Sequence, residues 1–147
     1  MRKFIALLFI VFLFLSSICN AFEPPDSNRW FWVNSDSKYG VWIDKQTFKA
    51  SKDTDRYSPT YNCRFAEAWI MWYVANSNTT ALLHNKYNLD RRLVRNLSVT
   101  VYNDAGNVIS SEDRASSYTS IIPNSWDESI LTWLDYAYII KTTPHQK

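Results

Sequence analysis

The apolar pattern from Arg29 onward is mostly that of β-strands. Aromatic and β-branched residues, which suit the pleated surface of a sheet, fill residues 30–33 and 39–43. Residues 34–37, which lie between these two runs, are Asn, Ser and Asp residues that favour turns. The pattern therefore predicts an N-terminal hairpin.

Two long strands are predicted in the middle of the chain. Residues 63–75 are mostly apolar at both odd- and even-numbered positions, so both faces of a strand here would be apolar. Ala66 and Ala68 also permit a helix, but the aromatic and β-branched residues that follow favour a strand. A turn at 76–80 follows, and then a strand over 81–89 that would pair with the preceding strand. Before these strands we expect a short segment at 44–48 and a polar surface loop over 50–59.

The clearest hairpin is predicted over residues 93–110. Its first arm alternates aliphatic with polar residues, which places the aliphatic set on the core side of a sheet. The turn follows at 103–106, where Gly106 can adopt the positive φ that closes such a loop without steric cost. Val108 and Ile109 begin the return arm.

The last element changes to helical spacing. Apolar residues recur at intervals of three and four, at Trp126, Ile130, Trp133, Leu134 and Ala137. Ser125 followed by Glu128 forms a capping box, and Asp127 with Glu128 suits the positive end of the helix dipole. The sequence therefore predicts an α+β, mainly β fold, in which one C-terminal helix packs on a bent antiparallel sheet of about six strands.

One helix leaves part of this sheet uncovered. A helix of about fifteen residues covers one face, whereas several strands here carry bulky apolar residues on both faces. Three arrangements would cover the second face: a sheet curled on itself, a second subunit, or an aromatic surface that meets a ligand. Curling is favoured because it needs no partner, and a homodimer comes next.

The first 21 residues are typical of a secretory signal peptide. Two basic residues precede an apolar run over residues 4–15, and small residues precede the expected cleavage site. A helix that spans a bilayer needs about twenty residues, so a retained membrane anchor is the less favoured alternative. Acylation of Cys19 is also less favoured, because Ile18 stands where a small residue is normally required. We therefore expect an exported protein that is secreted, periplasmic or at the cell surface.

The rest of the chain is expected to form one domain. Its predicted parts are an extended leader at 22–28, a β-rich domain with the helix at 29–141, and a tail at 142–147. All seven Trp and nine Tyr residues lie in this part, and aromatic side chains bury large areas. Loss of Cys19 leaves Cys63 as the one cysteine, so no internal disulfide is expected. A buried thiol is favoured over a bond between chains.

Charge and histidine content exclude two classes of function. Cleavage removes Arg2 and Lys3, so the formal charge of +2 falls to zero and a basic stripe for nucleic acid is lacking. The basic cluster at 90–95 is better explained as an exposed strand face. His84 and His145 lie far apart and have no neighbouring Cys or His, so neither a metal site nor a cofactor is predicted.

No catalytic set is predicted either. A Ser–His–acid triad would have to use His84 or His145, and the second of these lies in the expected tail. The adjacent carboxylates fit solvated loops or helix capping: Asp53 with Asp55, Glu112 with Asp113, and Asp127 with Glu128. A small exported hydrolase remains an alternative, as does a module that stacks exposed Trp and Tyr residues against a glycan or a peptide.

Four segments spread over the mature chain together carry a resemblance. They are the strand with Trp30 and Trp32, residues 39–48, the hairpin at 101–108, and residues 122–125 before the last helix. These segments resemble the surface-adhesin protein E family of small exported bacterial proteins. The resemblance implies a bent antiparallel sheet with a packed helix, display outside the cytoplasm and, in the named member, binding of host matrix proteins.

Together these observations predict a non-enzymatic binding or envelope-associated protein that acts outside the cytoplasm. Its ligand would be a protein or a glycan, and cleavage of the signal would leave no membrane span. The basic residues do not match a host-binding motif position by position. No binding residue is therefore assigned from the sequence.

Overall fold

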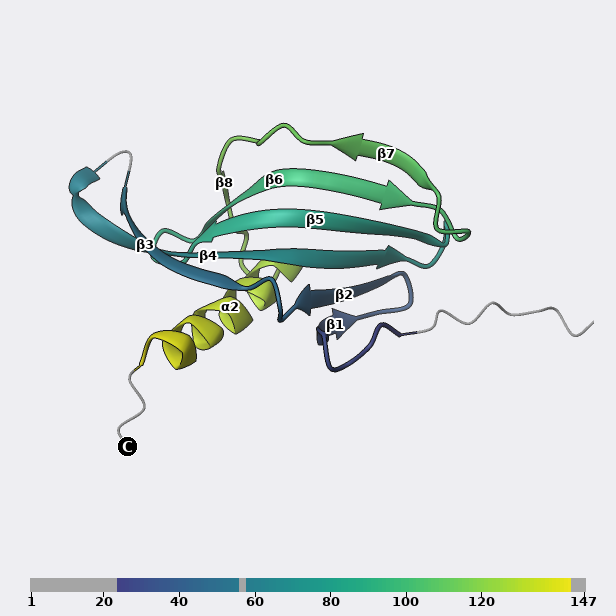
Figure 1. Ribbon diagram of the computed structural model, residues 1–147, viewed down its shortest axis with the longest axis horizontal. Coiled ribbons are helices and arrows are strands. Elements are labelled where there is room, and N and C mark those ends of the chain that lie inside the picture. Colours follow the sequence, from purple (N-terminus) through teal and green to yellow (C-terminus); the bar gives the residue numbers. More distant parts are fainter. Residues whose placement is uncertain (1–23, 56–57, 144–147) are drawn as a thin grey trace, which may run out of the picture.

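The chain folds into one antiparallel sheet of eight strands with a helix laid across it (Figure 1). The computed structural model describes residues 24–55 and 58–143, so the expected signal peptide and residues 144–147 lie outside the description. No helix in these two ranges is long and apolar enough to span a membrane. The elements are β1 (Trp30–Ser35), β2 (Tyr39–Asp44), β3 (Lys49–Asp55), β4 (Ser58–Val74), β5 (Thr79–Asn88), β6 (Leu93–Tyr102), β7 (Val108–Glu112), β8 (Thr119–Ser120) and α2 (Trp126–Thr142).

β4 organises the sheet, because its 17 residues are long enough to hold two partners on one edge. β2 pairs through residues 39–43 with residues 70–74 of β4, and β3 pairs through residues 49–54 with residues 62–67. β5 pairs along the other edge, and β6 and β7 follow it outward. The strand order β1-β2-β4-β5-β6-β7 therefore leaves β1 and β7 at the outer edges.

The predicted fold class is confirmed, with two strands, β3 and β8, more than expected. The sheet has eight strands instead of about six. The surface loop predicted over residues 50–59 is wrong, because β3 and the start of β4 occupy it, paired in register from Lys49 and Glu67 onward. Ser51, Lys52 and Asp53 are exposed. This hairpin is held by backbone pairing along the projecting end of β4 (Figure 1). Its sequence lacks the alternation of apolar and polar residues from which a strand would be predicted.

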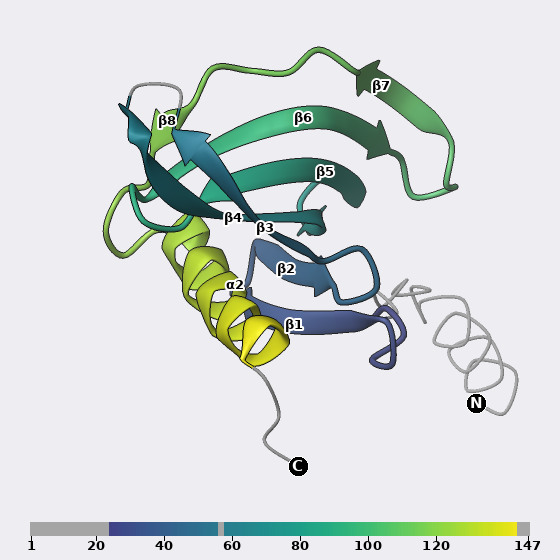
Figure 2. The same cartoon turned by 60° about the vertical axis from the view of Figure 1, so that its left-hand side comes forward.

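α2 packs its apolar stripe on one face of the sheet (Figure 2). The predicted N-cap forms, because Ser125 Oγ accepts the backbone N–H of Glu128 at 3.3 Å. The Glu128 carboxylate in turn accepts the backbone N–H of Asn124 at 2.6 Å, one residue earlier than in a standard capping box. The buried residues of α2 are Ile130, Leu131, Leu134 and Tyr138, and the sheet meets them with Val41, Ile43, Ala66, Ala68, Ile70 and Tyr87. The helix continues to Thr142, one residue into the predicted tail.

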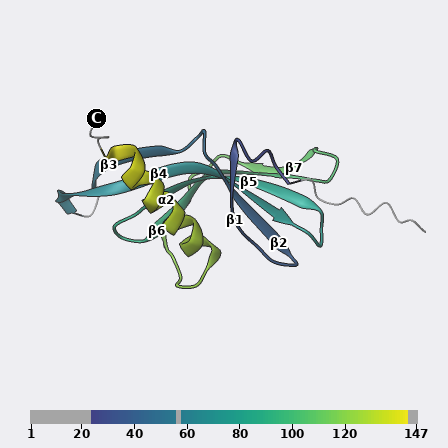
Figure 3. The same cartoon turned by 90° about the horizontal axis from the view of Figure 1, so that it is seen from below.

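The other face of the sheet is open. The sheet twists and bends, but no described helix or strand lies over the face opposite α2 (Figures 2 and 3). The strands stay in one sheet with two separate edges, so the sheet does not close on itself. It bends enough for Trp30 of β1 and Tyr102 of β6 to line one groove on this face, so the curling that the sequence favoured is confirmed in part. We call the surface opposite α2 the open face.

Gly106 closes the turn between β6 and β7 with a φ of +78°, as predicted. An added Cβ would meet no heavy atom within 4 Å, so strain from a substitution comes from the backbone alone. We expect Gly106→Val to lower the free energy of unfolding by about 1–2 kcal/mol, because L-residues are disfavoured in the left-handed region. Gly106→Asn should lose clearly less in urea unfolding, since Asn tolerates that region. Equal losses would contradict this assignment.

Candidate functional site

The strand registers bring side chains from five strands together on the open face. Residues directly opposite each other in an antiparallel pair share one face of the sheet. One row crosses the face through Trp32, Trp42, Met71, Leu82 and Thr100. The next row holds Trp69, His84 and Ser98, and the row beyond it holds Lys49, Glu67, Lys86 and Arg95. The open face thus has an aromatic half and a charged half.

A groove with a volume of about 190 Å³ lies on the aromatic half. Its walls are Trp30, Trp69, Leu82 and Tyr102, and its polar lining is Arg29, Thr47 and Thr100. Pockets for drug-sized ligands usually hold about 300–1,000 Å³, so this groove has room for one ring of a larger ligand. The groove therefore suits a part of an extended molecule that continues along the sheet.

Trp69 is held in one orientation by its neighbours. Its indole stacks on the His84 ring with a centroid distance of 4.9 Å and an interplanar angle of 10°. His84 Nε2 lies 2.9 Å from a Glu67 carboxylate oxygen, which anchors the imidazole in turn. The Trp69 backbone N–H donates to Thr47 Oγ1 at 3.1 Å. The wall of the groove is therefore built before any ligand arrives, which lowers the entropy that binding would cost.

Glu67 makes this support sensitive to acid. Partial burial by itself raises the pKa of Glu67, but hydrogen bonds from Lys49 and His84 outweigh that effect and hold the pKa below its ordinary value of 4.5. The stabilisation is therefore complete above pH 4.5 and is lost as the pH falls through the lower folded-state pKa. We expect the melting-temperature advantage of the wild type over Glu67→Gln to disappear in that range. A difference that does not change with pH would contradict this.

Arg29 and Asp44 form an ion pair beside the groove. The Arg29 Nε and one terminal guanidinium nitrogen donate to the same Asp44 oxygen at 2.9 and 2.7 Å. The Asp44 side chain is 0% exposed, and its other oxygen accepts the backbone N–H of Gln46 at 2.9 Å. The Arg29 guanidinium also lies 5.3 Å from the centroid of the Trp30 ring. The groove therefore carries no uncompensated charge of its own.

Three polar groups of the groove keep hydrogen-bonding capacity. The indole N–H groups of Trp30 and Trp69 and the hydroxyl of Tyr102 make no hydrogen bond to any other described residue. None of the three is a fully buried unsatisfied atom, so each is within reach of solvent. A site with aromatic walls and a few polar groups is the usual composition of a small-ligand site.

The residues weighed for catalysis do not converge on one site. His84 lies on the open face beside Glu67, whereas Asp53, Glu112 and Asp113 are exposed elsewhere. Asp127 lies under the start of α2, where burial raises its pKa and the Tyr87 hydroxyl lies 3.4 Å away. His145 lies outside the described residues. Across 24–55 and 58–143, no group of three or more His, Cys, Asp and Glu residues could hold a metal ion.

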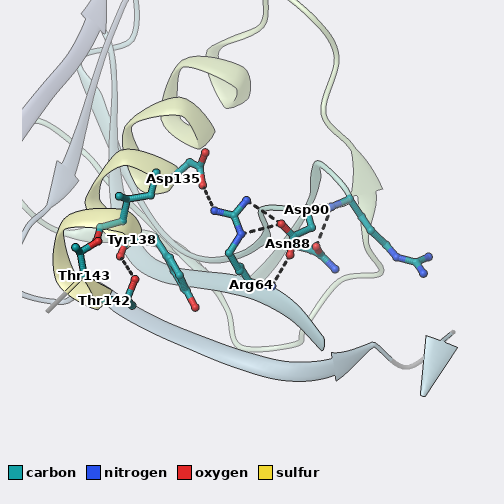
Figure 4. Close-up of polar contacts among 9 residues, drawn as sticks. Arg64, Asn88, Asp90, Asp135, Tyr138, Thr142 and Thr143 are labelled. Carbon is teal, nitrogen blue, oxygen red and sulfur yellow. Dashed lines mark hydrogen bonds and ion pairs between the residues drawn. The ribbon is translucent and has the colours of Figure 1, made fainter. Parts of the chain in front are cut away.

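A second hollow lies between β3 and the C-terminal end of α2, with a volume of about 500 Å³ (Figure 4). Arg64 dominates it and is already engaged, since its guanidinium donates to Asp90 at 2.8 Å and to Asp135 at 2.7 Å. The hydroxyls of Thr142 and Thr143 donate to helix carbonyls at 2.8 and 2.7 Å. Arg64 thus fastens α2 to the sheet, and the two threonine hydroxyls are satisfied within the helix, which makes the open-face groove the better candidate for a ligand.

Comparisons of the chain with protein-family models, with curated proteins and with solved structures gave no match. The resemblance to the surface-adhesin protein E family therefore stays a prediction from the sequence. The site is defined by its own geometry: an open antiparallel sheet with a rigid aromatic groove next to a charged row.

Proposed function

We propose that this protein is a non-enzymatic binding protein that acts outside the cytoplasm and holds its ligand on the open face. The observation that carries the proposal is the groove whose wall, Trp69, is fixed by stacking on His84. An aromatic surface that stays in contact with water costs free energy unless a partner covers it, and such surfaces commonly mark interaction sites. Trp32, on the same face, is 55% exposed.

Action outside the cytoplasm is supported by the N-terminal sequence. The basic start, the apolar run over residues 4–15 and the small residues before position 22 have the order of a secretory signal. The resemblance to a family of small exported proteins agrees with this reading. An adhesin-like or envelope-associated role would place the open face where it meets extracellular polymers or proteins.

The proposal is tested by ligand binding to the exported protein. Soluble glycans and peptides are titrated while tryptophan fluorescence is recorded. We expect at least one saturable ligand whose affinity falls about tenfold or more in Trp69→Ala, since central aromatic residues carry much of the binding energy of an interface. Tyr136→Ala, which removes an aromatic ring that is 64% exposed on α2, should leave binding unchanged. Binding that survives Trp69→Ala would refute the role of the open face.

A small exported hydrolase is the second candidate, and one observation favours it. Glu67 and His84 form an acid–imidazole pair, and Ser98 lies opposite His84 in the register of β5 and β6. No hydrogen bond joins Ser98 to His84 within the described part of the chain, whereas an activated nucleophile needs that contact to its base. Turnover of any probe that is lost in a folded His84→Ala variant would favour the hydrolase over the binding protein.

A further inference from the structure

The charged half of the open face contains two cations that lack an acidic partner. Lys86 and Arg95 lie opposite each other across β5 and β6, and neither forms an ion pair with an Asp or Glu of the described residues. Glu67, the acid in their row, is already bound to Lys49 at 3.2 Å and to His84 at 2.9 Å. The row Lys49–Glu67–Lys86–Arg95 therefore carries an excess of positive charge.

Aromatic rings hold both cations without neutralising them. The Lys86 ammonium lies 4.8 Å from the centroid of Phe65, and the Arg95 guanidinium carbon lies 4.9 Å from that of Tyr118. Cation–π contacts of this kind orient a cation but leave its charge in place. Arg95 Nε is buried and has no hydrogen-bond acceptor in the described chain, so no acceptor offsets its charge on the protein side. An anion bound at this row would supply the missing negative charge.

The charged row and the groove are close enough to serve one ligand. The row with Glu67 and Lys86 lies two residues along β4 and β5 from the row with Trp69 and His84. Two residues of a strand span about 6.6–6.8 Å. A ring in the groove and an anionic group on Lys86 would therefore belong to neighbouring units of one chain-like molecule.

The chemistry of the groove favours a sugar as the ring. A pyranose has apolar C–H faces, which pack on aromatic faces, and hydroxyl edges, which accept and donate hydrogen bonds. The groove walls supply the indole faces of Trp30 and Trp69. Polar contacts come from the two indole N–H groups and the Tyr102 hydroxyl, which make no hydrogen bond to another described residue. Because Arg29 is already paired with Asp44, the ring in the groove needs no charge of its own.

We propose that the open face binds an anionic glycan, with one sugar ring in the groove and the acidic group of an adjoining sugar on Lys86 and Arg95. This assignment rests on the proposed function of the open face and adds the class of ligand. A carboxylate and a sulfate supply the same charge at the row. An acidic peptide and a single-stranded oligonucleotide are the competing ligands that the test must separate.

The exported protein is titrated calorimetrically with a tetrasaccharide of galacturonic acid and with its methyl ester, which keeps the sugar rings and removes the charge. A sulfated tetrasaccharide from heparin shows whether sulfate is preferred to carboxylate. We expect the free acid or the sulfated sugar to bind about tenfold or more tightly than the ester, since a charge-assisted hydrogen bond is worth about that factor. Lys86→Gln should bring the ratio close to one, and the matched surface variant Lys38→Gln should preserve it.

The outcomes separate the ligand class from the function. Equal affinity for acid, ester and sulfated sugar, or tighter binding of an acidic peptide or a single-stranded oligonucleotide, would overturn the anionic glycan. If such a competitor still lost affinity in Trp69→Ala, the open face would remain the binding site. If no probe lost affinity in Trp69→Ala, both the ligand class and the proposed function would fail.

Discussion

Replacement of Leu134 by alanine should lower the free energy of unfolding by about 2–5 kcal/mol. Leu134 lies at 0% exposure in the middle of α2, within the core that the helix shares with the covered face of the sheet. Truncation removes the transfer free energy of the lost methyl groups and leaves a cavity, since a helix and a sheet held by several further contacts close it only in part. Urea unfolding of the two proteins gives the difference directly.

Ile140→Ala is the matched control on the same helix. Ile140 is 48% exposed, so its truncation opens no closed cavity and should change stability by about 0.5 kcal/mol or less. Both variants should keep any ligand affinity of the groove as long as they are folded, because the helix and the groove lie on opposite faces of the sheet. Similar losses in the two variants would contradict the packing of α2 on the sheet.

The C-terminal helix was predictable because its signals are local. Spacings of three and four, a Ser at the N-cap and acids in the first turn act within a few residues, and the structure has each of them in place. Gly106 belongs to the same group, since the turn that it closes is defined by four consecutive residues. β3 could not be predicted in this way, because its pairing to β4 depends on backbone contacts that a polar sequence does not reveal.

The alternation of apolar residues could not predict which face of β4 meets the helix. Both parities of residues 63–75 are apolar, so alternation alone does not say which face meets the helix. In the structure Ala66 and Ala68 lie at 0% exposure on the helix side, where small side chains let α2 approach closely. Trp69 and Met71 project on the open face. Residue size separates the two faces only near Ala66 and Ala68, because Trp72 lies on the helix side as well, against Trp126 of α2.

The candidate site was less accessible to sequence reasoning than the fold. The groove joins Arg29, Thr47, Trp69 and Tyr102, which are separated by tens of residues and become neighbours only through the strand registers. The sequence suggested exposed Trp and Tyr residues as one possible recognition surface, but it favoured curling of the sheet, which would have buried them. A pairing such as that of Arg29 with Asp44 has no local sequence signature.

Arg29→Met should lower the free energy of unfolding clearly more than an ordinary surface substitution does, because the buried Asp44 carboxylate would lose the cation that it faces. Asp44 would lose two short hydrogen bonds while its side chain, now 0% exposed, keeps the bond from the Gln46 backbone N–H. Lys45→Met is the matched control, since Lys45 is an exposed cation next in sequence to Asp44. Among the described residues its ammonium group bonds only to the Ser27 carbonyl, at 2.8 Å. Its loss should stay near 0.5 kcal/mol or below.

A double variant separates the charge from the packing of the Arg29 side chain. Asp44→Asn removes the buried charge and keeps an oxygen for the Gln46 N–H, so Arg29→Met combined with Asp44→Asn should be clearly less destabilised than the sum of the single variants. The loss of ligand affinity in the double variant should likewise be smaller than the sum of the losses in the two single variants, because Arg29 lies over Trp30 at the edge of the groove. Strict additivity would mean that Arg29 supports the groove through its aliphatic stem, and the ion pair would then have no part in holding the site.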